Sequence, residues 1–154
     1  MSKELSNDYI LIVKAHYLVA EKMKRLTENN KFVYDFSSQQ DITDLYLVSD
    51  LLITDYSSVM FDYSVLKRPM YFYVYDYEEY RDALRGFYFD LKAEAPGPCV
   101  ESTDALIHEI KKGEDYYYQV YKDKYECFSE KFNHLDDGTS SDKIINYLLI
   151  DGGN

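Results

Sequence analysis

The sequence predicts an α/β fold in which a parallel sheet carries helices on both faces. Apolar segments typical of strands alternate with helical patterns from residue 9 to about residue 75. This β-α-β order requires right-handed crossovers, which place the strands parallel to one another. The 154 residues and their 46 % hydrophobic content suit a single ordered domain. We expect an α/β core over residues 9–100 and C-terminal helices over residues 101–154.

The first half of the core contains two predicted strands and two predicted helices. Residues 9–15 (YILIVKA) and 32–36 (FVYDF) are short apolar runs typical of strands. Residues 17–28 have the spacing of a helix, which two asparagines end. Asp41 is expected to cap a short helix. The expected apolar side of that helix consists of Ile42, Leu45, Tyr46 and Val48.

The second half of the core continues the alternation. Residues 51–53 form a strand that leads directly into a helix from Ser57, and Pro69 stops that helix. Residues 70–75 (MYFYVY) form the fourth predicted strand. We expect residues 76–98 to be irregular. Further helices are expected at about 102–112, 114–132 and 140–150. The charged, tyrosine-rich helix from residue 114 suits a solvated or bracing helix rather than a site.

The most informative segment is Asp50–Asp62 (DLLITDYSSVMFD), in which a buried strand feeds into a helix. Ser57 and Ser58 lie at the helix start, where backbone N–H groups lack partners and the helix dipole is positive, which suits a phosphate. Asp62 lies one turn further on and is expected to point toward the same ligand. Ser and Asp near a helix start are also ordinary N-caps, which contribute about 1 kcal/mol without any ligand. The position beyond the carboxyl end of a strand favours a binding site.

Two other residues are expected at the same edge of the sheet. His16 follows the first strand in residues 14–17 (KAHY), and a nearby phosphate would raise its pKa, which suits a hydrogen-bond donor, charge stabiliser or general acid. Arg85 precedes Gly86 in a loop after the fourth strand and could contact an anionic ligand. The alternatives are a structural histidine and an arginine at a helix C-terminus with its glycine cap.

Composition narrows the function classes. The formal net charge of −11 argues against a general nucleic-acid-binding or anionic-membrane-binding surface, so an anionic ligand must be held locally. Cys99 and Cys127 lack metal-ligand spacing and are expected to be free thiols in a reducing cytoplasm. No apolar run approaches the roughly 20 residues that span a bilayer. No glycine-rich phosphate loop and no resident metal or cofactor site is predicted.

Several segments form an ordered set along the chain: KAHY at residues 14–17, Asp50–Pro69, Tyr75–Asp76, Leu84–Tyr88 (LRGFY), Pro96–Pro98, and Asp137-Gly138 with Ser140. In this order they closely resemble the C-terminal, nucleotide-binding half of the CDP-glycerol glycerophosphotransferases. These are the teichoic acid glycerol-phosphate primases and polymerases of Gram-positive bacteria. The resemblance covers roughly residues 9 to 145.

The resemblance implies a GT-B architecture of two Rossmann-like domains, with the donor bound mainly to the second. The implied reaction transfers glycerol phosphate from CDP-glycerol to a teichoic acid chain or linkage lipid and releases CMP. Ser57 and Ser58 would hold the donor phosphates, Asp62 a ribose hydroxyl, and His16 the phosphate undergoing transfer. Arg85 is a further donor-side candidate. Cation assistance stays open, because phosphoryl transfer requires charge neutralisation.

The chain departs from the family in length. The family's N-terminal acceptor domain carries a second histidine, in a His-Gly setting, proposed as the base, and no such motif precedes Tyr9. The first strand of the nucleotide-binding domain is also expected to be missing. We therefore expect a fragment that binds donor without turnover, from an enzyme located in the cytoplasm or peripherally at the inner face of the membrane. A CDP-ribitol or other CDP-polyol transferase, a stand-alone nucleotide-binding module and a ligand-free structural domain are the alternatives, and the oligomeric state stays open.

Overall fold

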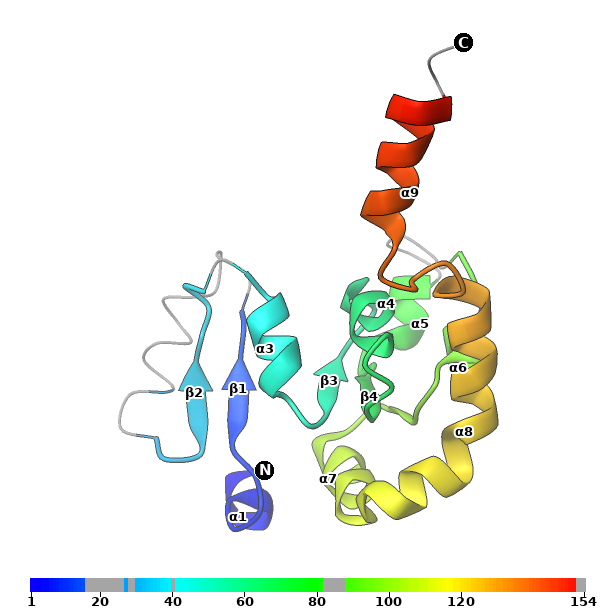
Figure 1. Cartoon of the computed structure of the whole chain (residues 1–154). Coiled ribbons are helices and arrows are strands. Elements are labelled where there is room, and N and C mark those ends of the chain that lie inside the picture. Colours follow the sequence, from blue (N-terminus) through cyan, green and yellow to red (C-terminus); the bar gives the residue numbers. More distant parts are fainter. Residues whose placement is uncertain (16–26, 28–29, 40, 82–87, 152–154) are drawn as a thin grey trace.

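The computed structural model describes residues 1–15, 27, 30–39, 41–81 and 88–151. Within these ranges, parallel strands are flanked by helices, which confirms the predicted fold class (Figure 1). The strands are β1 (Leu11–Val13), β2 (Val33–Asp35), β3 (Leu52–Thr54), β4 (Met70–Tyr73) and β5 (Cys99–Val100). The helices are α1 (Ser2–Leu5), α3 (Thr43–Val48), α4 (Val59–Ser64), α5 (Tyr77–Glu79), α6 (Leu91–Glu94), α7 (Thr103–Lys111), α8 (Gly113–Phe132) and α9 (Ser140–Asn146), which continues into the π-helical turn η2 (Tyr147–Asp151).

The strands are paired in two groups. β1 pairs with β2, with Leu11 opposite Val33, and β3 pairs with β4, with Leu52 opposite Met70. β5 continues the second group on the far side of β4. Every pair is parallel, and Figure 1 shows the labelled strands of both groups running toward its top. The serine turn after β3 and the segment after β4 therefore lie on the same side of the molecule.

The core is centred on β4. Met70 and Phe72 of this strand have no exposed surface, and neither does Val74, which follows it. The tyrosines and phenylalanines of α8 close the core from the side opposite β3 (Figure 1). Aromatic rings also join α4 to α8, since the rings of Phe61 and Phe128 stack with centroids 5.7 Å apart. This packing fixes the position of α4, which carries the predicted site residues.

Helix α8 braces the sheet through tyrosine hydroxyls, as its composition predicted. The buried Tyr117 hydroxyl donates a hydrogen bond to the Pro96 carbonyl and accepts one from the Met70 N–H at 3.0 Å. The Tyr125 hydroxyl donates to the Arg68 carbonyl at 3.0 Å. Burial raises the pKa of Tyr117 far above that of an exposed tyrosine, so its hydroxyl stays protonated and able to donate.

Replacing Tyr117 with phenylalanine is expected to lower the free energy of unfolding by about 2–4 kcal/mol, because two buried backbone groups lose their partner. Urea denaturation measures this change. Tyr116 is 39 % exposed, and Tyr116→Phe serves as the matched control, with an expected change below about 0.5 kcal/mol. Equal effects of the two variants would show that the Tyr117 hydroxyl contributes nothing specific.

Four details of the predicted elements were wrong. The helix after Ser58 ends at Ser64 and not at Pro69, because the chain turns through Lys67, whose φ of 55° lies in the left-handed region. Residues 76–98 include the short helices α5 and α6, and the strand β5 follows them. The side chain of Val48 is not on the buried side of α3, since it is 65 % exposed. The last predicted helix is α-helical only to Asn146.

Candidate functional site

The predicted phosphate turn lies between β3 and α4. Its conformation is held by Asp55, whose carboxylate accepts a hydrogen bond from the Ser57 N–H at 3.0 Å. The Ser57 hydroxyl oxygen lies 3.5 Å from the Val59 nitrogen, at the outer limit of a hydrogen bond. Ser58 occupies the N-cap position of α4, yet its side chain makes no capping hydrogen bond. Capping therefore does not account for Ser58, and its exposed hydroxyl can meet a ligand.

The turn is also fixed to the segment after β4. The Tyr56 hydroxyl donates a hydrogen bond to the Asp76 carboxylate at 2.8 Å. The ring of Tyr56 stacks on that of Tyr80, with centroids 4.2 Å apart. Burial raises the pKa of Tyr56, and the hydrogen bond to Asp76 raises it further. This hydroxyl therefore remains a donor at neutral pH. Asp76 and Tyr80 thus position the serine turn.

Asp62 lines an open cavity of about 710 Å³ beside α4. Ser57 and Ser58 are not among its lining residues, but Ser58 lies four residues before Asp62 and therefore on the same side of the helix. The cavity is bounded by α3, α4, the end of α8 and the start of α9. Its polar lining residues are Thr43, Tyr46, Asp62, Asn133, Asp136, Ser140 and Ser141.

Tyr46 brings a buried polar group to this cavity. Its hydroxyl has no hydrogen-bond partner in the described part of the chain. Burial raises the pKa of Tyr46, and the nearby Asp62 carboxylate raises it further. The hydroxyl therefore stays protonated. A carboxylate acceptor and an unsatisfied hydroxyl donor from residues that line the same cavity are suited to a ligand that carries hydroxyl groups.

Asn133 forms the opposite wall of the cavity. Its amide donates hydrogen bonds to the Phe61 carbonyl and to the Asp136 carboxylate, both at 3.1 Å. The hydroxyl oxygen of the fully buried Ser64 lies 2.7 Å from the Asn133 amide oxygen. These contacts hold the end of α8 against α4. Sequence reasoning missed Tyr46, Asn133, Asp136 and Ser141, because their roles depend on contacts between segments that are distant in the chain.

The predicted segment at Asp137 and Gly138 joins α8 to α9 at the cavity. Gly138 has φ of 77°, in the left-handed region, and lines the cavity together with Ser140. Hydrogen bonds from Lys143 and Thr139 hold the pKa of Asp137 well below its usual range. The structure therefore brings together Asp62 and the later segment of the resemblance, which are far apart in the sequence.

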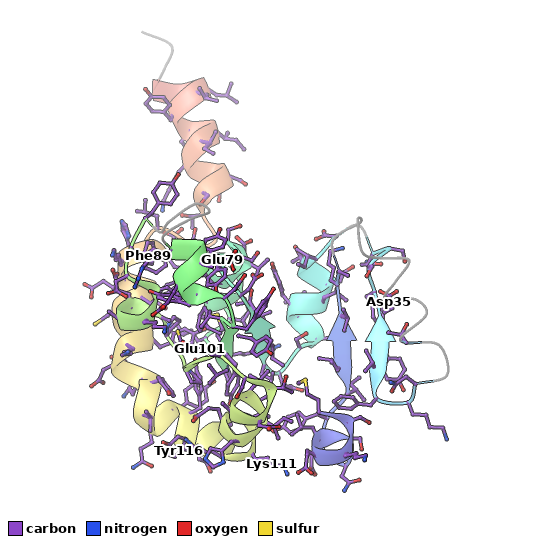
Figure 2. The ribbon with its side chains drawn as sticks, turned by 180° about the vertical axis from the view of Figure 1, so that it is seen from behind. Asp35, Glu79, Phe89, Glu101, Lys111 and Tyr116 are labelled. Carbon is purple, nitrogen blue, oxygen red and sulfur yellow. The ribbon has the colours of Figure 1, made fainter. Side chains whose placement is uncertain are left out.

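The carboxyl ends of β1 and β2 meet at the same edge of the sheet. The Ala15 N–H donates to the Ser37 hydroxyl at 3.0 Å, and that hydroxyl donates to Asp35, which lies at the upper end of β2 (Figure 2). His16 and Arg85 lie outside the described residues, so their predicted roles stay predictions. Cys99 and Cys127 are free thiols, as predicted.

Residues 1–150 match the model of a family described as CDP-glycerol:poly(glycerophosphate) glycerophosphotransferase. The chain belongs to this family. The resemblance drawn from the ordered motifs is therefore confirmed. Across the described residues, no helix is both long and apolar enough to cross a membrane, and no group of three or more His, Cys, Asp or Glu residues is placed to hold a metal ion.

Relatives within the family are enzymes of teichoic acid synthesis. The chain is 52 % identical over 151 residues to the teichoic acid poly(glycerol phosphate) polymerase of Bacillus subtilis, covering 97 % of this chain and 20 % of that protein. It is 47 % identical over 149 residues to the teichoic acid glycerol-phosphate transferase of Staphylococcus aureus, covering 97 % of this chain and 37 % of that protein. The chain thus spans well under half the length of these relatives.

A solved structure supports the same relationship. The wall teichoic acid polymerase TagF superposes with a TM-score of 0.86 and 39 % sequence identity, over 97 % of this chain and 36 % of that one. The fold described above, with parallel strands flanked by helices, is therefore shared with TagF, a GT-B-like protein. Ribitol-phosphate enzymes of the family are less similar, as the poly(ribitol-phosphate) polymerase of Bacillus spizizenii is 35 % identical over 148 residues.

Proposed function

We propose that this chain is the donor-binding part of a glycerophosphotransferase. The enzyme moves glycerol phosphate from CDP-glycerol to a teichoic acid chain or a lipid-linked acceptor and releases CMP. The observation that carries this proposal is the open cavity beside α4, which Asp62 and Tyr46 both line in a chain of this family. Asp62 lies one helical turn from Ser58, and the Tyr46 hydroxyl has no hydrogen-bond partner in the described residues. A hydroxyl-bearing group with adjacent phosphates, such as a nucleoside diphosphate, is the ligand that suits this combination.

The donor spans the cavity beside α4 and the serine turn. The ribose lies in the cavity, where Asp62 accepts a hydrogen bond from a ribose hydroxyl and Tyr46 donates one. The diphosphate lies at the serine turn, where the hydroxyls of Ser57 and Ser58 and the N–H groups of the turn donate to it. Because α4 has only six residues, the donors of the turn contribute more than the helix dipole.

His16 is assigned to the phosphate undergoing transfer and Arg85 to a further donor-side contact, both from the sequence resemblance. A proton-donating histidine suits this position because the leaving CMP gains negative charge. The domain acts at the cytoplasmic side of the membrane, and the acceptor is bound by a separate domain. Glycerol is favoured over ribitol as the donor polyol because the glycerol-phosphate relatives show the higher identity.

Calorimetric titration of the folded chain with CDP-glycerol, CDP and CMP tests this proposal. We expect CDP to bind more tightly than CMP, and a Ser57→Ala/Ser58→Ala double variant to bind CDP at least about tenfold more weakly, because charge-assisted hydrogen bonds are lost. CMP binding should change less, since it lacks the second phosphate.

Ser102→Ala is the matched control. Ser102 is an N-cap whose side chain does accept a hydrogen bond, from the Ala105 N–H at 3.2 Å. Its loss should cost about 1 kcal/mol of stability and leave CDP affinity unchanged. Unaltered CDP affinity in the folded double variant would overturn the phosphate assignment. No binding of any CDP compound by the folded wild-type chain would overturn the proposal that this chain holds the donor site.

A further inference from the structure

The cavity beside α4 has room for more than a ribose. Its volume of about 710 Å³ lies within the range of about 300–1,000 Å³ that is usual for pockets that bind a whole small molecule. A ribose in contact with Asp62 and Tyr46 would fill only part of this space. The cavity can therefore also hold the group that is attached to the ribose, which in a nucleotide is the base.

The lining of the cavity suits an uncharged group that donates hydrogen bonds. Among the described residues, the side chains that line it include the carboxylates of Asp62 and Asp136 and no lysine, arginine or histidine. The two carboxylates would repel a phosphate. Sugar hydroxyls and the amino group of a base, in contrast, are donors from which a carboxylate accepts. The cavity is therefore suited to the nucleoside part of a nucleotide, with the phosphates outside it.

Helix α4 gives the order of the bound groups along the cavity. Ser58, Asp62 and Val65 are spaced i, i+4 and i+7, so they lie along one side of the helix. The rise is about 6 Å from Ser58 to Asp62 and about 4.5 Å from Asp62 to Val65. These steps resemble those from phosphate to ribose and from ribose to base in a nucleotide. Because the ribose joins the diphosphate to the base, a diphosphate at Ser58 and a ribose at Asp62 place the base near Val65.

Apolar side chains line the part of the cavity that α3 and α4 form. Val65, at the end of α4, is 46 % exposed, and Leu47 of α3 is 57 % exposed, although both line the cavity. Leu66 and Phe132 line it as well. Ligand pockets typically combine such an apolar lining with a few polar groups that fix the orientation of the ligand. The flat face of a pyrimidine would cover these exposed apolar side chains.

Asp136 brings a fixed carboxylate to the opposite wall. Its carboxylate accepts a hydrogen bond from the Asn133 amide at 3.1 Å, and its N–H donates to the Asn133 carbonyl at 2.9 Å. The Asn133 amide also donates to the Phe61 carbonyl of α4 at 3.1 Å, so Asp136 is tied to the helix that orders the ligand. A carboxylate offers about four lone-pair sites, and Asp136 can therefore accept a further hydrogen bond.

We propose that this cavity holds the base of the donor and that Asp136 distinguishes cytosine from uracil. This inference rests on the proposed function and adds to it the recognition of the base. The Asp136 carboxylate accepts a hydrogen bond from the exocyclic amino group of cytosine, the contact by which acidic side chains recognise cytosine in DNA. Uracil has a carbonyl oxygen at the same position, which the carboxylate repels because neither group supplies a proton.

Calorimetric titration with CDP and with UDP tests this inference, since the two nucleotides differ only in the base. We expect the wild-type chain to bind CDP at least about tenfold more tightly than UDP. Asp136→Asn should lose most of this preference, because its amide can accept from the cytosine amino group or donate to the uracil carbonyl oxygen. The matched control is Asp142→Asn on α9, which removes the same charge from a residue that does not line the cavity and should keep the wild-type preference.

A second readout follows the amino group itself. In CDP labelled with ¹⁵N at this group, the amino proton signals should shift on binding to the wild type and shift less on binding to Asp136→Asn. Circular dichroism shows whether each variant is folded.

The outcomes separate this inference from the proposed function. Equal affinity of the wild type for CDP and UDP, or an unchanged preference in folded Asp136→Asn, would overturn the role of Asp136. Equal weakening of both nucleotides in that variant would overturn it as well. The donor site itself would stand in these cases if the Ser57→Ala/Ser58→Ala variant still bound CDP more weakly than the wild type. Failure of the folded wild type to bind either nucleotide would overturn both proposals.

Discussion

Gly97→Ala is expected to lower the free energy of unfolding by at least about 3 kcal/mol. A Cβ atom at Gly97 would overlap the Met70 carbonyl oxygen and lie 3.1 Å from the Tyr117 hydroxyl oxygen. The overlapping atom is backbone of the central strand β4, so it cannot move like a flexible side chain. Relief of the overlap would separate β4 from β5, whose pairing includes the Phe72 N–H to Pro98 carbonyl hydrogen bond at 2.9 Å.

Urea denaturation followed by circular dichroism measures this loss. Gly113→Ala is the control, because a Cβ atom there has no neighbour within 4 Å and the only penalty comes from its φ of 83°. That penalty is about 1 kcal/mol. Similar losses in the two variants would mean that steric overlap with β4 is not what requires glycine at residue 97.

The sequence predicted the segments with continuous apolar character and clear boundaries. β3, the serine turn and the start of α4 follow from an apolar run that ends in polar residues and resumes with helical spacing. β5 was not predicted, because two residues after Pro96–Pro98 have no detectable alternation. Its existence depends on pairing with β4, which is a tertiary contact.

Tertiary contacts also explain what was missed at the site. Asp62 was identified because it lies one helical turn from the serines, a relation that the sequence displays directly. Tyr46 has the helical spacing of a core residue, and no local pattern reveals that its hydroxyl is unsatisfied. Val48 was placed on the apolar side of α3 because it also has the helical spacing of a core residue, although its side chain is exposed.

Asp62→Asn is expected to weaken CDP binding about ten- to a hundredfold. A hydrogen bond to a charged group contributes about 1.5–3 kcal/mol, and the amide keeps the shape of the carboxylate while losing its charge. Asp62 is exposed at the cavity, so its replacement should change stability by less than about 0.5 kcal/mol. Loss of affinity would therefore come from the ligand contact and not from unfolding.

A CDP analogue without ribose hydroxyls tests whether the Asp62 carboxylate contacts the ribose. If the Asp62 carboxylate accepts from a ribose hydroxyl, the wild type should prefer CDP to the analogue, and Asp62→Asn should lose most of that preference. Asp115→Asn, in the first turn of α8 and at the end of that helix away from the cavity, is the charge-matched control and should behave like the wild type. If Asp62→Asn loses affinity equally for CDP and for the analogue, the carboxylate contacts another part of the ligand. The ribose would then be reassigned to other polar residues that line the cavity, among which Asp136 also carries a carboxylate.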